Sequence, residues 1–151
     1  VWNRPPPDCI PSDTKGAGLY MICTLSKHEA EKNGFTDALM LDYKGRVSES
    51  TGSNIFLVIN GEIHTPVPDC FLNGITRQAV IEIAKNEGIK VIERDIYPDE
   101  IKNAEEIFLT GSAVEVTPVG KIDNQTFKVG DITAKISSLY MKEVDPNYKD
   151  N

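Results

Sequence analysis

Basic residues are in the minority in this chain of 151 residues, where 16 lysines and arginines stand against 23 aspartates and glutamates. The formal net charge at neutral pH is −7, and the basic residues form no run along the sequence. Because a chain of this charge is repelled by a phosphate backbone, we expect no nucleic-acid partner.

Cysteine and histidine are also sparse. The three cysteines, Cys9, Cys23 and Cys70, are odd in number and far apart, and the two histidines, His28 and His64, are isolated. This spacing predicts neither a disulfide framework nor a zinc site, so we expect no bound metal. Unpaired thiols are typical of a reducing compartment, which favours a cytoplasmic location.

Long apolar runs are missing as well. No run approaches the roughly 18 residues of a membrane span, and the N-terminus lacks a signal pattern, so we expect no membrane partner. The chain begins without methionine on Val1, and repeated prolines oppose a regular helix in the first 14 residues. We therefore expect a piece of a longer protein, with a Pro-rich interdomain segment over 1–14, one domain over 15–146 and a polar tail over 147–151.

The apolar residues, 40% of the chain, are enough for the core of one domain. Their spacing, together with the turn residues between them, predicts the secondary structure. We expect helices over 16–33, 74–88, 97–103 and 132–144, and strands over 38–41, 46–49, 54–59, 62–65, 89–93, 106–109, 116–122 (interrupted by Pro118) and 126–129. Asn60-Gly61 is typical of a two-residue hairpin turn. The expected fold class is α/β, with a mixed, largely hairpin-built sheet or pseudo-barrel flanked by helices.

Glu49 is the unusual residue of the predicted strands. It follows Val47 and precedes the apolar run that begins at Asn54, so it should lie near the interior where a strand ends. A carboxylate in that position needs a cationic or proton-donating partner. The same local pattern also fits an ordinary surface turn between two strands.

Three further features could belong to a binding site. Lys15 immediately precedes a predicted helix, where a cation opposes the helix dipole. The segments Gly74-Ile75-Thr76 and Gly111-Ser112-Ala113 each offer N–H groups and a hydroxyl suited to a phosphate. Each feature alone also fits a surface lysine, a helix start or a turn. Together with Glu49 they match pyridoxal phosphate, which needs a lysine for its aldehyde, an acid for its pyridine nitrogen and donors for its phosphate.

The sequence closely resembles the fold-type-IV pyridoxal-phosphate aminotransferases, and among them the branched-chain amino acid aminotransferases, over nearly its whole length. The resemblance rests on four ordered motifs, which are Trp2-Asn3-Arg4 leading to Lys15-Gly16-Ala17-Gly18 with Tyr20, Val47-Ser48-Glu49 with Gly52-Ser53-Asn54-Ile55-Phe56, Leu72-Asn73-Gly74-Ile75-Thr76-Arg77, and the run from Phe108 to Val119.

The resemblance implies roles for these residues. Lys15 would bond to the cofactor aldehyde and move the substrate proton, Glu49 would pair with the pyridine nitrogen, Tyr20 would hydrogen-bond the phenolic oxygen, and Leu72 would pack on the ring. Gly74, Ile75, Thr76 and Ser112 would hold the phosphate, and Ser112 and Ala113 would receive the substrate carboxylate. Arg77 would lie one residue beyond this cradle.

The implied reaction is transamination of leucine, isoleucine or valine with 2-oxoglutarate as acceptor, in a homo-oligomer built from dimers. A D-amino acid aminotransferase or an aminodeoxychorismate lyase of the same fold stays an alternative. Asn73 departs from the proline usual in this family. The family's small N-terminal domain, which supplies an arginine for the phosphate and part of the substrate pocket, is not in this sequence. A non-catalytic fragment that folds and binds cofactor weakly is therefore a further alternative.

Overall fold

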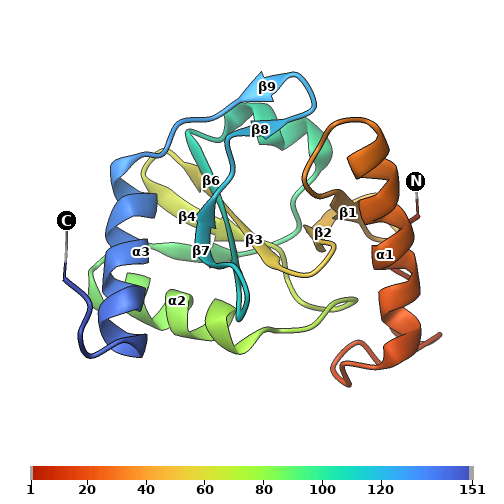
Figure 1. Ribbon diagram of the computed structural model, residues 1–151, viewed down its shortest axis with the longest axis horizontal. Coiled ribbons are helices and arrows are strands. Elements are labelled where there is room, and N and C mark those ends of the chain that lie inside the picture. Colours follow the sequence, from red (N-terminus) through yellow and green to blue (C-terminus); the bar gives the residue numbers. More distant parts are fainter. Residues whose placement is uncertain (1, 150–151) are drawn as a thin grey trace.

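The computed structural model describes residues 2–149. Val1 of the expected interdomain segment, and Asp150 and Asn151 of the expected polar tail, lie outside this range. Within this range, nine strands and four helical segments follow one another (Figure 1). Their order is α1 (Ala17–Lys32), β1 (Leu39–Leu41), β2 (Val47–Ser50), β3 (Asn54–Ile59), β4 (Glu62–Thr65), α2 (Ile75–Asn86), β5 (Val91–Glu93), the 3₁₀ helix η1 (Pro98–Asn103), β6 (Glu106–Gly111), β7 (Glu115–Pro118), β8 (Lys121–Ile122), β9 (Gln125–Thr126) and α3 (Asp131–Val144).

The main sheet has seven strands, and β3 is its centre. Strand β6 pairs antiparallel with β3 from Asn54 opposite Thr110 to Val58 opposite Glu106. Strands β2 and β4 also pair antiparallel with β3, β2 at Asn54 and β4 from Leu57 onward. Strand β1 adds to β2, β7 adds to β6, and β5 joins β4 in parallel. The start of β3 therefore lies between β2 and β6.

Two apolar cores lie on the two faces of β3, because successive side chains of a strand point to opposite sides. Phe56 and Val58 pack with residues of α2 and α3, whereas Ile55 and Leu57 pack with residues of β2 and η1. Phe56 stacks on Phe108 of β6 with ring centroids 4.9 Å apart. Each such side chain contributes about 1.5–3 kcal/mol by its burial. In Figure 1, α2 and α3 accordingly lie together against one side of the sheet.

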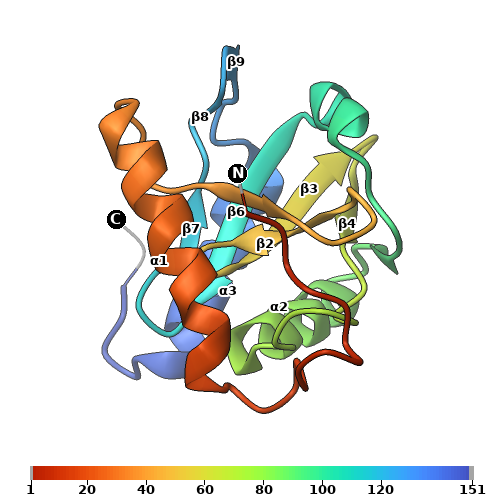
Figure 2. The ribbon, with the colours of Figure 1, turned by 90° about the vertical axis from the view of Figure 1, so that its right-hand side faces the viewer.

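Helix α1 lies at the other end of the molecule, beside β1 and β2 (Figures 1 and 2). It buries Leu19 and Cys23 against the domain and leaves most of its other side exposed. The segment before α1 returns along β1, where Arg4 forms an isolated parallel bridge with Asp42 and its N–H donates to the Leu41 carbonyl at 2.8 Å. Residues near the start of the chain are thus packed against the domain.

The structure confirms the α/β class and the hairpin over residues 54–65. Asn60 and Gly61 have φ values of 52° and 73°, as the predicted turn requires. The pseudo-barrel alternative is wrong, because the outer strands β1, β5 and β7 do not pair with one another in the described part of the chain.

Several predicted elements differ from the structure in kind or extent. The strand expected over 126–129 ends already at Thr126, as β9. The strand expected over 116–122 is divided, because β7 ends at Pro118, which has no N–H to donate, and β8 lies in a separate two-stranded sheet with β9. Strand β5 begins at Val91 and pairs in parallel with β4, so it follows a crossover through α2 rather than a hairpin. The short helix after Tyr97 is 3₁₀.

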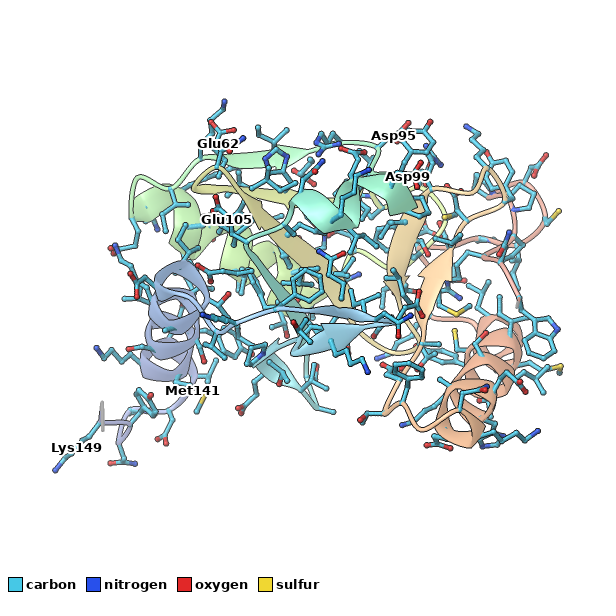
Figure 3. All side chains as sticks on the ribbon, turned by 90° about the horizontal axis from the view of Figure 1, so that it is seen from above. Glu62, Asp95, Asp99, Glu105, Met141 and Lys149 are labelled. Carbon is cyan, nitrogen blue, oxygen red and sulfur yellow. The ribbon has the colours of Figure 1, made fainter. Side chains whose placement is uncertain are left out.

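Acidic side chains such as Asp99 and Glu105 are exposed, and Figure 3 shows them projecting from the surface.

No helix within residues 2–149 combines the length and apolar character needed to cross a membrane.

Arg46 joins three segments that lie far apart in the sequence. Its guanidinium, which is almost fully buried, pairs with Asp42 in the turn after β1, with Asp69 in the loop before α2 at 2.7 Å, and with Asp95 after β5 at 2.7 Å. Burial opposes the charge of Arg46, but Asp69 and Asp42 outweigh it and raise the pKa of Arg46, so the residue stays charged. Since Asp42 is itself only 2% exposed, its charge depends on this partner.

Arg46→Met should therefore destabilise the fold by about 3–5 kcal/mol, because it leaves the Asp42 carboxylate buried without its partner. The measurement is the free energy of unfolding from urea denaturation at pH 7. Lys90→Met is the matched control, since the Lys90–Glu62 pair is exposed and contributes about 0–1 kcal/mol. Equal unfolding midpoints for the two variants would show that Arg46 does not anchor the three segments.

Candidate active site

One cavity of about 290 Å³ lies where α1, β2, β6 and the start of α2 meet. It brings together nearly all of the residues predicted from the sequence, namely Lys15, Tyr20, Glu49, Leu72, Gly74, Ile75, Thr76 and Ser112. Ala113 is exposed next to Ser112 but is not among the lining residues. Gly111, part of the predicted Gly111-Ser112-Ala113 segment, also lines the cavity. Sequence reasoning assigned no individual role to the other residues of the wall, which are Arg4, Thr51, Gly52, Ser53, Asn54, Asn73 and Thr110.

Lys15 and Tyr20 reach the cavity from the start of α1. Gly16 is the N-cap residue of this helix, no side chain caps it, and its first turn has no acidic residue. Lys15 is exposed and forms no ion pair within the described residues, while Tyr20 is 40% exposed. The lysine amine is therefore available on the cavity wall.

Glu49 comes from β2 and is 6% exposed. Its carboxylate forms a close ion pair with the guanidinium of Arg4, which is equally buried. Burial raises the pKa of Glu49 to about 7, although the positive charge of Arg4 opposes the change. The buried acid thus exchanges its proton near neutral pH, which suits a group that binds a basic ring nitrogen.

Arg4 is the cationic partner that the position of Glu49 demanded, but the sequence did not identify it. Its Nη1 also donates to the Leu19 carbonyl at 3.2 Å and to Cys23 Sγ at 3.5 Å, both on α1. One guanidinium therefore connects the strand that carries Glu49 to the helix that follows Lys15. The only signal was the Trp2-Asn3-Arg4 motif, which has no local feature that assigns its arginine to Glu49.

The start of α2 forms an anion-binding wall. Gly74 is its N-cap residue, no side chain caps the helix, and its first turn has no acidic residue. The N–H groups of Ile75 and Thr76 have no acceptor within the described residues. Across the cavity, the Thr110 hydroxyl is fully buried and lacks a hydrogen-bond partner in the described part of the chain. Unpaired donors at a helix N-terminus favour a negatively charged ligand.

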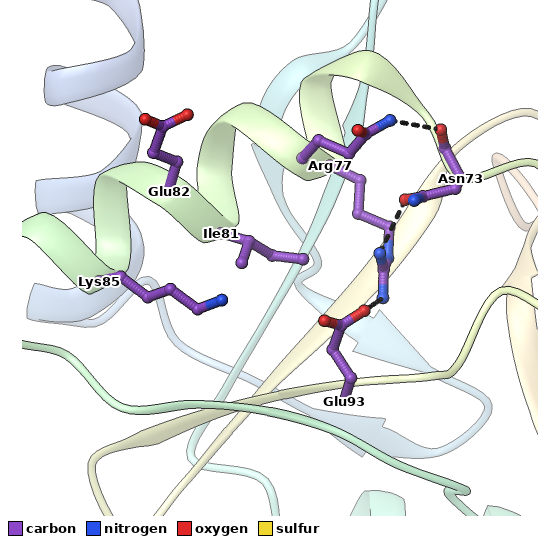
Figure 4. Close-up of a pocket in the computed structure, with 7 residues that line it drawn as sticks. Asn73, Arg77, Ile81, Glu82, Lys85 and Glu93 are labelled. Atoms are coloured by element: carbon purple, nitrogen blue, oxygen red, sulfur yellow. Dashed lines mark hydrogen bonds and ion pairs between the residues drawn. The ribbon is translucent and has the colours of Figure 1, made fainter.

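Asn73 stands between this cavity and a shallow groove on the outer side of α2. Its Oδ1 accepts a hydrogen bond from Arg77 Nη1 at 2.8 Å, and Arg77 Nη2 pairs with Glu93 at 2.7 Å (Figure 4). Arg77, 1% exposed, also donates to the Pro66 carbonyl at 2.9 Å. Arg77 therefore holds the loop before α2 from the side away from the cavity and does not line it. This agrees with the expectation that Arg77 lies one residue beyond the cradle.

Comparison with known proteins agrees with this geometry. The family model described as amino-transferase class IV matches residues 1–122. The chain is 43% identical over 148 residues to a probable branched-chain-amino-acid aminotransferase of Aquifex aeolicus, covering 95% of this chain and 48% of that protein. It is 39% identical over 129 residues to the branched-chain-amino-acid aminotransferase of Pseudomonas aeruginosa, covering 83% and 42%.

Solved structures give the same result. A branched-chain aminotransferase of Thermoproteus uzoniensis with norvaline superposes on this chain with a TM-score of 0.92 at 38% identity. The match covers 95% of this chain and 49% of the Thermoproteus uzoniensis chain. A branched-chain amino acid aminotransferase of T.th., complexed with N-(5'-phosphopyridoxyl)-L-glutamate, gives 0.94 at 36% identity, covering 98% and 51%.

The chain belongs to the class IV aminotransferase family, and the predicted fold type is confirmed. It spans about half the length of the curated relatives it matches.

The raised pKa of Glu49 predicts a measurable pH dependence of stability. Between its ordinary pKa of 4.5 and about 7, the folded protein retains a proton that the unfolded chain has lost, so this group lowers stability as pH rises through that window. Glu49→Gln should remove this contribution. The free energy of unfolding of the ligand-free chain, measured at pH 4.5, 6 and 7.5, should therefore fall less steeply for the variant than for the wild type.

Glu31→Gln serves as the control, because Glu31 is exposed on α1 and lies in none of the site contacts described above. It should reproduce the wild-type slope. If Glu49→Gln also reproduces it, Glu49 titrates at its ordinary pKa and is not desolvated as described.

Proposed function

We propose that this chain forms the cofactor-binding part of a pyridoxal-phosphate-dependent branched-chain amino acid aminotransferase. One observation carries the proposal, which is that a single cavity joins the Lys15 amine, the buried Glu49 acid and the uncapped start of α2. The names of the Aquifex aeolicus and Pseudomonas aeruginosa relatives support the branched-chain assignment. The T.th. structure contains an adduct of the cofactor with glutamate, which supports glutamate and 2-oxoglutarate as the second substrate pair.

The residues fit four groups of pyridoxal phosphate. Lys15 provides the amine for its aldehyde, and Tyr20 provides a hydroxyl for its phenolic oxygen. Glu49, with its pKa near 7, provides the acid for the pyridine nitrogen. The unpaired N–H groups of Ile75 and Thr76 receive the phosphate, together with the Thr76 hydroxyl and Ser112.

Other residues that line or adjoin the cavity complete this assignment. Leu72 packs on the ring, and Gly74 brings the backbone close to the phosphate. The exposed Ser112-Ala113 turn between β6 and β7 presents N–H groups to the substrate carboxylate. Arg4 keeps the Glu49 side chain in place on its buried side, because it contacts the carboxylate and α1 at once.

Bound pyridoxal phosphate supplies an electron sink for the bond between the substrate Cα and its hydrogen. The chain supplies the proton transfer and the orientation. Lys15 Nζ, once released from the cofactor, would take the proton from Cα as a base and deliver it as an acid to the carbon that had carried the aldehyde, which leaves the substrate at the oxidation level of a 2-oxo acid. Glu49, which is buried, would hold a proton on the pyridine nitrogen when the cofactor is bound.

The same proposal includes the organisation of the complete protein. Residues 15–146 form its cofactor-binding domain, and residues 1–14 connect this domain to a smaller N-terminal one. That smaller domain would supply an additional cation for the phosphate and cover the substrate side chain. The complete protein is a homo-oligomer built from dimers and acts in the cytoplasm on amino acids and 2-oxo acids. The coverage of about half of each relative supports this organisation.

Lys15→Ala should abolish covalent attachment of pyridoxal phosphate without lowering stability, because an exposed lysine before a helix makes no stabilising contact and opposes the dipole. Borohydride reduction of the loaded chain, followed by peptide mapping, should place the label on Lys15 alone. Lys27→Ala, on the exposed side of the same helix, is the matched control and should keep the label. A label on any other lysine contradicts the assignment.

Substrate class can be tested with the loaded chain in a single half-reaction. L-Leucine should convert the bound cofactor to its amine form, which absorbs at shorter wavelength, and 2-oxoglutarate should reverse the change. Conversion by D-alanine but not by L-leucine would favour the D-amino acid alternative. Attachment without conversion by either amino acid would favour a fragment that binds cofactor but does not turn over.

A further inference from the structure

We propose that Asn54 is a positioning residue whose side chain holds the Leu72–Gly74 loop against the sheet and thereby sets where the phosphate cradle opens relative to Glu49. This role rests on the proposed function of the cavity. It concerns a residue of β3 whose side-chain hydrogen bonds go to Leu72 and Gly74 rather than to Lys15 or Glu49.

The position of Asn54 in the sheet is the first observation. Its backbone pairs with Glu49 on one side and with Thr110 on the other. It is 5% exposed and lines the cavity. The residue therefore lies between the strand that carries Glu49 and the strand that carries Thr110, and it faces the cavity that the loop before α2 also lines.

The hydrogen bonds of the Asn54 side chain are the second observation. Its Nδ2 donates to the Leu72 carbonyl at 2.9 Å, and its Oδ1 accepts from the Gly74 N–H at 3.2 Å. The amide thus binds the loop on both sides of Asn73 with one donor and one acceptor. Aspartate has the acceptor but no donor, and alanine has neither, so only the amide satisfies both backbone groups.

These bonds also decide which N–H groups remain for an anion. The Gly74 N–H is taken by Asn54, so the free donors begin at Ile75 and Thr76. Asn54 and Gly74 fit together closely, because a Cβ on Gly74 would lie 2.5 Å from Asn54 Oδ1. Glycine is therefore required at the start of α2 by the amide beside it, although Gly74 has an ordinary negative φ of −60°.

The structure separates this role from the anchoring of Glu49. The β2–β3 turn is closed by backbone, with the Ser50 N–H donating to the Ser53 carbonyl at 2.8 Å. Glu49 is held by Arg4. Removal of the Asn54 side chain should therefore disturb the phosphate end of the cavity and leave the lysine and the acid in place.

The test compares pyridoxal phosphate with pyridoxal, which lacks the phosphate, as ligands of the chain. Dissociation constants are measured from the absorbance of the covalently attached form. Asn54→Ala should weaken pyridoxal phosphate by about tenfold, the effect of losing one or two backbone hydrogen bonds, while leaving pyridoxal unchanged. Equal weakening of both ligands would overturn the role, because a general structural defect does not distinguish them.

A double-mutant cycle provides the second measurement. Gly74→Ala should reduce the preference for pyridoxal phosphate in the wild-type background, where the new Cβ meets the amide, and should have a smaller effect beside Asn54→Ala, where the amide is gone. Gly120→Ala is the control, since nothing lies within 4 Å of its Cβ position. Equal effects of Gly74→Ala in the two backgrounds would contradict the coupling.

Three further outcomes are decisive. If Asn54→Ala does not fold, Gly74→Ala alone must still lower affinity for pyridoxal phosphate selectively, and a non-selective loss overturns the role. A folded wild-type chain that attaches neither ligand at Lys15 overturns the proposed function itself, and the role of Asn54 with it. Attachment of both ligands with no preference for the phosphate upholds the lysine site but rejects the cradle.

Discussion

The ion pair between Arg4 and Glu49 is the interaction on which the arrangement of the site depends. A carboxylate that is 6% exposed cannot keep its charge without a close partner, and the partner here comes from the segment before α1. That guanidinium also contacts the Leu19 carbonyl and Cys23, so the helix that begins after Lys15 is held by the same group. The need to compensate one buried acid therefore fixes the position of the lysine relative to it.

Secondary structure was predictable wherever local chemistry decides it. The Asn60-Gly61 turn, the glycines at the starts of α1 and α2, and the apolar stripe of α3 are all visible within a few residues. The pairing of β2 and β6 with the same strand was not, because a turn between strands does not by itself identify the partner and β6 lies far along the chain, so only tertiary contacts select these pairings. The parallel pairing of β5 depends on α2 crossing the sheet, which no local pattern records.

The site was predictable to the extent that each residue carries its own chemistry. Lys15, Glu49 and the two small-residue loops have side chains or free N–H groups that suggest a ligand, and the resemblance to a family gave them specific roles. Arg4 and Asn54 act on other protein groups instead, and their partners lie 45 and 18 to 20 residues away in the sequence. Contacts of this kind follow from the fold, so sequence spacing does not reveal them.

The side chains of β3 point alternately into the two cores, and this alternation links core packing to the geometry of the ligand site. A shift of one residue in the β3–β6 register would exchange Phe56 and Val58 with Ile55 and Leu57, and the same shift would move Asn54 away from Thr110. The apolar side chains strongly oppose such a shift, since every one of them would face the wrong side. The hydrophobic cores thus fix the register of β3, and this register sets the position of the polar groups at the end of the strand. Residues that do not contact a ligand therefore determine the spacing of the site.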